Sequence, residues 1–73
     1  MGRLRVLSGK QVCAVLAGHG FAAVRQRGSH IIMQKHIAHS TITVPVPNHR
    51  EIAIGTLLSI IRQSHVPRAA FEV

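Results

Sequence analysis

Acidic residues are scarce in this sequence. Glu51 and Glu72 are the only two among 73 residues, against nine lysines and arginines, and the formal net charge is +7. A chain this basic favours a polyanionic partner, and nucleic acid, an acidic protein and an anionic membrane surface all meet that requirement. The charge balance therefore indicates a class of partner before any motif is considered.

Long apolar runs are also absent. No apolar run approaches the ~20 residues that span a bilayer, so we expect neither a transmembrane helix nor a membrane partner. The polar stretch Ser8–Gln11 interrupts the apolar segment that a signal peptide would need. Cys13 is the only cysteine, which excludes an internal disulfide and makes a reducing cytoplasm the expected location. We interpret Cys13 as a small core residue, because no neighbour would lower its pKa and make it a nucleophile.

Aromatic residues are limited to Phe21 and Phe71, and both are expected in the core. Stacking of nucleic-acid bases on an aromatic surface is therefore not expected. If the polyanionic partner is RNA, the chain would recognise its backbone and its shape.

The ligand set of a metal site is missing too. His36 and His39 are three residues apart, but no carboxylate lies near them and the cysteine is distant. Both histidines fall in the expected loop between the second and third strands. Side chains three residues apart point the same way on a helix, and a loop does not bring them together in this way. We therefore expect no metal site and no other cofactor, and we interpret these histidines as solvated loop residues.

A first helix is expected to begin after Ser8. Ser8 and Gln11 have the spacing of a capping box, in which each side chain bonds to the backbone N–H of the other residue. Three apolar residues then recur at helical spacing and form one face: Val12, Val15 and Leu16. Gly18 and Gly20 follow, and left-handed conformations at both are expected to end the helix.

Three short extended runs come next: FAAVRQR, HIIMQK and STITVPV. Gly28-Ser29 separates the first two, which are expected to form a hairpin. The third has the alternation of a half-buried strand, and its Pro45 indicates an edge or a strand end. Ile32 falls on the more polar face of the middle run. It is either an ordinary exposed isoleucine or a contact for a partner.

A second helix is expected to open at Gly55-Thr56 and to end near Gln63. Its apolar residues repeat at i, i+3 and i+4: Leu57, Ile60 and Ile61. The final RAAFEV is expected to form a short turn that packs Phe71 on the core. The order helix, three strands, helix predicts an α+β fold of two layers, a three-stranded antiparallel sheet with both helices on one face, in a single domain over residues 1–73.

Five segments, taken in order, resemble one known family. They are Ser8-Gly9-Lys10, HGF at 19–21, RQRGSHII at 25–32, TVPVPNH at 43–49 and GTLLSIIRQS at 55–64. The sequence is similar to the HicA family of toxins, small ribonucleases whose α-β-β-β-α fold is like that of the double-stranded RNA-binding domain. The resemblance implies an mRNA interferase of a type II toxin–antitoxin pair, neutralised by a HicB-type antitoxin. It also implies that His30, in Gly-Ser-His, is the catalytic residue.

Histidine suits RNA cleavage whatever the family. A base has to take a proton from the ribose 2′-hydroxyl and an acid has to supply one to the leaving oxygen, and the ordinary imidazole pKa of about 6.5 fits both tasks near neutral pH. Arg25 and Arg27 would hold the phosphate and stabilise its developing charge. Gly28 permits the tight turn that places His30 at the first residue of a strand.

Both candidate histidines have a structural interpretation as well. His30 can be a strand-end histidine bonded to a neighbouring backbone group, which the residues alone favour and the family resemblance outweighs. His49 is a possible second acid or base, because the irregular segment after the third strand can return it toward the sheet. A hydrogen bond that stabilises the turn explains His49 equally well.

Five residues are candidates for RNA contact, because they adjoin His30 or are expected to form a basic patch around it: Lys10, Arg25, Arg27, Ser29 and Lys35. Arg62 and Arg68, expected along the second helix, are candidates for contact with an acidic antitoxin instead.

The sequence therefore favours a metal-independent endoribonuclease that acts on single-stranded or loosely structured mRNA through one essential histidine. A non-catalytic RNA-binding module is the alternative, and a pure protein-interaction domain comes third. Turnover of RNA separates the first from the second. Tight binding to an acidic protein with little RNA affinity would identify the third.

Overall fold

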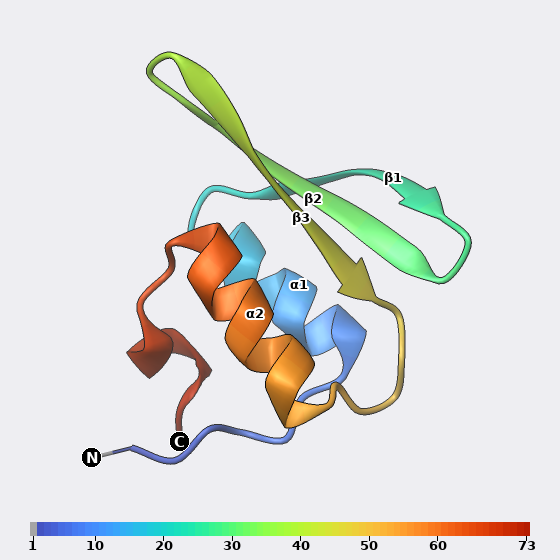
Figure 1. The fold of residues 1–73 in the computed structure, drawn as a ribbon, viewed down its shortest axis with the longest axis vertical. Helices are drawn as coiled ribbons and strands as arrows, with labels where there is room; N and C mark the ends of the chain where they lie inside the picture. Colours follow the sequence, from blue (N-terminus) through green and yellow to red (C-terminus); the bar gives the residue numbers. More distant parts are fainter. Residues whose placement is uncertain (1) are drawn as a thin grey trace.

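The computed structural model of the chain describes residues 2–73. Along the chain it has helix α1, strands β1 to β3, helix α2 and a short 3-10 helix η1 (Figure 1). The strands form one antiparallel sheet in the order β1-β2-β3. The expected α+β fold with the order α-β-β-β-α is confirmed.

The three strands are β1 (Ala22–Arg27), β2 (His30–Ile37) and β3 (Ser40–Pro47). Gly28 and Ser29 join the first two as the expected hairpin turn, with Arg27 paired to His30 across it. β3 is an edge strand, as Pro45 indicated, because a proline cannot donate a ladder hydrogen bond and is tolerated where no further strand follows.

The helices are α1 (Gly9–Ala17), α2 (Ile54–Ser64) and η1 (Arg68–Phe71). The capping box of α1 is present, since the Gln11 N–H donates to Ser8 Oγ at 3.1 Å and the Ser8 N–H donates to Gln11 Oε1 at 2.9 Å. Within residues 2–73, no helix has both the length and the apolar content to cross a bilayer.

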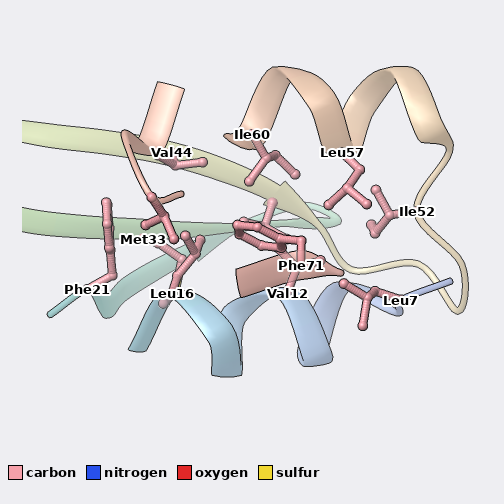
Figure 2. Close-up of a cluster of buried hydrophobic side chains, with 12 residues drawn as sticks. Leu7, Val12, Leu16, Phe21, Met33, Val44, Ile52, Leu57, Ile60 and Phe71 are labelled. Atoms are coloured by element: carbon pink, nitrogen blue, oxygen red, sulfur yellow. The ribbon is translucent and has the colours of Figure 1, made fainter. Parts of the chain in front are cut away.

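Both helices pack on one face of the sheet, and the core lies between these two layers (Figure 2). Its buried side chains come from α1, α2 and η1, from β2 and β3 and from the connecting segments: Leu7, Val12, Leu16, Phe21, Met33, Val44, Val46, Ile52, Leu57, Ile60, Val66 and Phe71. Phe71 is fully buried in the middle of the cluster, so the expected return of the last turn onto the core is confirmed.

The two ends of the chain lie side by side (Figure 1). The Arg5 N–H donates to the Phe71 carbonyl at 2.9 Å, and the Val73 N–H donates to the Arg3 carbonyl at 2.9 Å. These bonds fix η1 against the segment that leads into α1.

Two sequence expectations about backbone and burial were wrong. Gly18 is right-handed, with φ −64°, and only Gly20 is left-handed, with φ +93°. Ile32 is 7% exposed rather than an exposed isoleucine. Its register partners are Arg25 on β1 and Pro45 on β3. Partners in register share a face, so these side chains flank Ile32 on the open face, which is the face of the sheet that the helices leave uncovered.

Two boundary expectations also need correction. α2 begins at Ile54 and ends at Ser64, one residue beyond the expected range at each end. The helix ends there because His65 adopts φ +60°, a left-handed conformation that breaks the helical hydrogen-bond pattern.

Candidate active site

The face of the sheet that the helices leave uncovered carries arginine and histidine side chains near the turn between β1 and β2. Arg27 pairs with His30, and Arg25 pairs with Ile32, so these four side chains share that face. The expectation that Arg25 and Arg27 share one face of β1 is confirmed. Residues directly opposite on antiparallel strands have Cβ atoms about 5 Å apart, which places the Arg27 and His30 side chains within reach of one bound group.

The turn that delivers His30 depends on Gly28. Gly28 has φ +58°, which favours glycine, and the Ser29 φ is not positive, a combination typical of a tight two-residue hairpin turn. The Gln26 side-chain amide donates to the Gly28 carbonyl at 3.2 Å and braces the turn. His30 is therefore the first residue of a central strand rather than part of a loop.

The His30 side chain is exposed and unengaged. Among residues 2–73 it has no side-chain hydrogen-bond partner. The alternative interpretation, a strand-end histidine bonded to backbone, finds no such bond here. Both ring nitrogens are free to meet a ligand.

The chain after β3 is bonded both to the turn between β1 and β2 and to the start of α1. The Asn48 N–H donates to the Ser29 carbonyl at 2.6 Å, and the Gly9 N–H donates to the His49 carbonyl at 2.8 Å. Gly9 lies so close to the Pro47 carbonyl that a Cβ there would overlap it. It is the backbone of His49, not its imidazole, that makes the hydrogen bond in this turn.

A small hollow lies at this junction. It has a volume of about 270 Å³ and is lined by residues at the start of α1 and by residues that follow β3: Ser8, Lys10, Asn48, His49 and Arg50. We call it the α1 cleft. His49 and Lys10, two of the residues singled out in the sequence, thus line one hollow.

Lys35 lies elsewhere, which corrects the expectation of a patch that includes it. It is five residues beyond His30 on β2, so it is about 17 Å along the strand and on the opposite face. Its Nζ lies 5.9 Å from the centre of the Phe21 ring. Lys35 lines a larger hollow of about 660 Å³ beneath the β2–β3 hairpin, together with His19 and His65.

The side chains of Arg62 and Arg68 are bonded to residues near them in the chain. The Arg62 guanidinium donates to Ser59 Oγ at 3.1 Å within α2. Arg68 lies in η1, not along the second helix as expected, and its Nε donates to Glu72 Oε2 at 2.8 Å. Both side chains lie outside the group formed by Arg25, Arg27 and His30.

The remaining candidate groups are placed as follows. His36 lies in β2 rather than in the expected loop, and its Nδ1 is 3.2 Å from Thr41 Oγ1, whereas His39 lies in the turn after β2. Over residues 2–73, no three histidine, cysteine or carboxylate side chains come together as metal ligands would. Burial raises the pKa of the Cys13 thiol, which fits a core residue better than a nucleophile.

Asn48 and Arg50 are site residues that the sequence reasoning missed. Arg50 directly follows His49, and that adjacency was the available signal. This adjacency alone could not place Arg50 at the site. The direction of the irregular segment after β3 is set by its hydrogen bonds to Ser29 and Gly9, which the sequence does not display.

Comparison with known proteins gives one match. A family model described as "HicA toxin of bacterial toxin-antitoxin" matches residues 9–66, a span that contains His30 and most of the α1 cleft. No curated protein and no solved structure matches the chain.

Proposed function

The chain belongs to the HicA toxin family, which makes it the toxin of a toxin–antitoxin pair, and from this premise we propose that it is an endoribonuclease that cleaves mRNA. In this proposal His30 is the essential general acid/base, with His49 as a second group that can return a proton to the leaving oxygen. No metal takes part, and the site of action is the cytoplasm.

One observation carries the proposal. His30 is exposed, has no side-chain hydrogen bond within residues 2–73, and lies directly across the hairpin from Arg27. A free imidazole beside a guanidinium on a rigid sheet is suited to a reaction that moves protons at an anionic centre. The three strands carry no carboxylate that would repel a phosphate from this face.

The reaction follows from these groups. An imidazole nitrogen of His30 takes the proton of a ribose 2′-hydroxyl, and the 2′-oxygen attacks the neighbouring phosphorus. The bond from phosphorus to the 5′-oxygen breaks, and that oxygen receives a proton. The products are a 2′,3′-cyclic phosphate and a 5′-hydroxyl, so the atoms balance without water or metal. Arg27, with Arg25 beside it, stabilises the charge that develops on the phosphate oxygens.

His49 is the proposed second acid or base. It follows β3 by two residues, and β3 ends at Pro47, the register partner of His30. Its imidazole has no side-chain hydrogen bond within the described part of the chain, so it is free to supply the proton to the leaving oxygen.

The proposed RNA contacts differ in position. Arg25, Arg27 and Ser29 adjoin His30, whereas Lys10 lies at the α1 cleft. Lys35 is on the opposite face, so it can contact only a part of the RNA that bends around the sheet. Because the sequence has no tryptophan or tyrosine and Phe21 and Phe71 are buried, RNA is held through its phosphates and riboses rather than by stacking on these rings.

A single-ribose substrate tests the chemistry. We expect the chain to cleave a DNA oligonucleotide with one internal ribonucleotide at that position in EDTA, and to leave the all-deoxy oligonucleotide intact. The upstream product should carry a cyclic phosphate, seen by mass spectrometry. If the oligonucleotides are bound but the ribonucleotide is never cut, and cellular mRNA is also left intact, the chain is the non-catalytic RNA-binding module.

The antitoxin is proposed to be of the HicB type and acidic where it meets this chain. Nine cations against two acids make an acidic surface the complementary one. Addition of the purified antitoxin should stop RNA cleavage, and its association rate should fall as salt increases. Association that is unaffected by salt would contradict an electrostatic docking.

A further inference from the structure

The α1 cleft has a chemical character of its own. Three of its five lining residues, Lys10, His49 and Arg50, can carry positive charge, and the other two, Ser8 and Asn48, are neutral and polar. No carboxylate lines it, and Glu51, which follows Arg50, is not among the lining residues. The surroundings favour an anion.

Side chains, not the backbone of the helix, supply this character. Two of the first three amides of α1 are already used, since the Gly9 N–H donates to the His49 carbonyl and the Gln11 N–H donates to Ser8 Oγ. The cations of Lys10 and Arg50 are available, because neither side chain has a hydrogen bond or ion pair with another of residues 2–73.

The size and position of the cleft restrict the anion. About 270 Å³ is below the ~300–1,000 Å³ of pockets that enclose a whole small molecule, so the cleft suits one group of a larger ligand. The Cα atoms of His30 and Pro47 are about 5 Å apart as register partners, and two more residues add at most about 7 Å to reach His49. A short run of nucleotides spans that distance.

We propose that the α1 cleft is a second phosphate subsite, in which Lys10 and Arg50 hold a phosphate of the RNA next to the one that is cleaved at His30. This inference rests on the proposed ribonuclease function. It adds that the enzyme gains RNA affinity from one phosphate beside the cleaved bond and that Arg50 is a binding residue.

Neutral phosphates test the subsite. A short RNA with one cleavage site is prepared with each flanking phosphate replaced in turn by an uncharged methylphosphonate. Binding is measured with His30→Ala chain, which leaves the RNA intact, and with the same chain carrying Lys10→Gln and Arg50→Gln. The matched control carries Arg3→Gln and Arg62→Gln, which remove the same charge away from the cleft. Circular dichroism confirms that each variant is folded.

We expect one flanking methylphosphonate to weaken binding about tenfold or more, as the loss of a charge-assisted contact does. In the Lys10→Gln, Arg50→Gln chain, the same replacement should weaken binding little further. In the control chain it should weaken binding by the full factor. With His30 intact, the cleft variant should raise KM and leave kcat within about twofold, because the contact is equally strong in the bound ground state and in the transition state.

Equal sensitivity of the cleft variant and the control to every methylphosphonate would overturn the subsite. That outcome is separate from a failure of the proposed function. If no RNA is cleaved even with His30 intact, the catalytic claim fails, and the binding measurements still decide whether the cleft holds a phosphate.

Discussion

Gly28 is the residue on which the position of His30 depends most directly. Its φ of +58° strains any other residue, and no atom lies within 4 Å of the place a Cβ would take. Gly28→Ala therefore adds strain without a clash, and we expect it to lower the free energy of unfolding by about 1–2 kcal/mol. Thermal unfolding measures the loss, and RNA cleavage should fall with it as the turn relaxes.

Gly55→Ala is the matched control for the turn. Gly55 also has open space around it, but it lies in the first turn of α2 without a positive φ. Alanine there should leave stability unchanged or raise it by up to about 1 kcal/mol. Similar losses from the two substitutions would show that the positive φ at Gly28 is not what matters.

Cys13 offers a test of burial. Because burial raises the pKa of its thiol, the folded chain disfavours the thiolate. The protonated thiol therefore stabilises the folded chain relative to the unfolded chain. This contribution is complete below the pKa of the unfolded thiol and is lost as pH rises through the pKa of the folded one. Iodoacetamide, which attacks thiolates, should modify Cys13 more slowly in the native chain than in urea at pH 8. Equal rates would mean that the thiol is exposed.

Gly9 joins α1 to the end of β3. A Cβ on Gly9 would overlap the Pro47 carbonyl, and a backbone atom cannot move aside as the end of a side chain can. Gly9→Ala should push α1 away from the sheet and destabilise the fold by about 1–3 kcal/mol, the usual range for overpacking. Urea unfolding measures it.

Gly18→Ala, at the residue that caps the C-terminal end of α1, serves as the comparison. Gly18 has φ −64°, and the nearest atom to an added Cβ is the Val15 carbonyl oxygen at 3.4 Å, an ordinary contact distance. Its effect should stay within about 0.5 kcal/mol, as for most surface substitutions. A loss as large as that of Gly9→Ala would contradict the close approach of α1 to β3.

Much of the element structure could be read from the sequence because local chemistry determines it. The Ser8 and Gln11 capping box, the Gly28-Ser29 turn and the alternation that buries Val44 and Val46 all depend on near neighbours in the chain. Ile32 could not be read in this way. Its burial depends on which residues of β1 and β3 flank it, and the register of three strands sets that.

The whole molecule presents a strongly positive field, and its RNA affinity should reflect that. If Lys10, Arg25, Arg27 and Arg50 each neutralise one phosphate, the logarithm of the affinity should fall with the logarithm of salt concentration with a slope of about −3 for a single strand. Fluorescence anisotropy with His30→Ala chain gives the slope, and sucrose at matched osmolality is the control. A slope near zero would rule out a phosphate-based interface.

The candidate site could be predicted only where it follows the hairpin. His30 and Arg27 are neighbours because a two-residue turn joins β1 to β2, a relation that the sequence displays. The α1 cleft brings Lys10 together with His49 and Arg50 from the other side of the chain, which only the tertiary hydrogen bonds determine. Lys35 was misplaced although the sequence contains the signal: it lies five residues from His30 on the same strand, and alternation of side chains puts it on the opposite side of the sheet.

The central claim is that His30 cleaves RNA without metal, and the most direct measurement is cleavage of an end-labelled mRNA in EDTA and an inhibitor of contaminating ribonucleases. Wild-type chain, freed of antitoxin and shown to be folded, is compared with His30→Ala protein prepared identically. The account predicts cleavage by the wild type alone, with RNA affinity equal within about twofold, because the imidazole acts on protons rather than on binding. Undiminished cleavage by His30→Ala, or none by either protein, would contradict it.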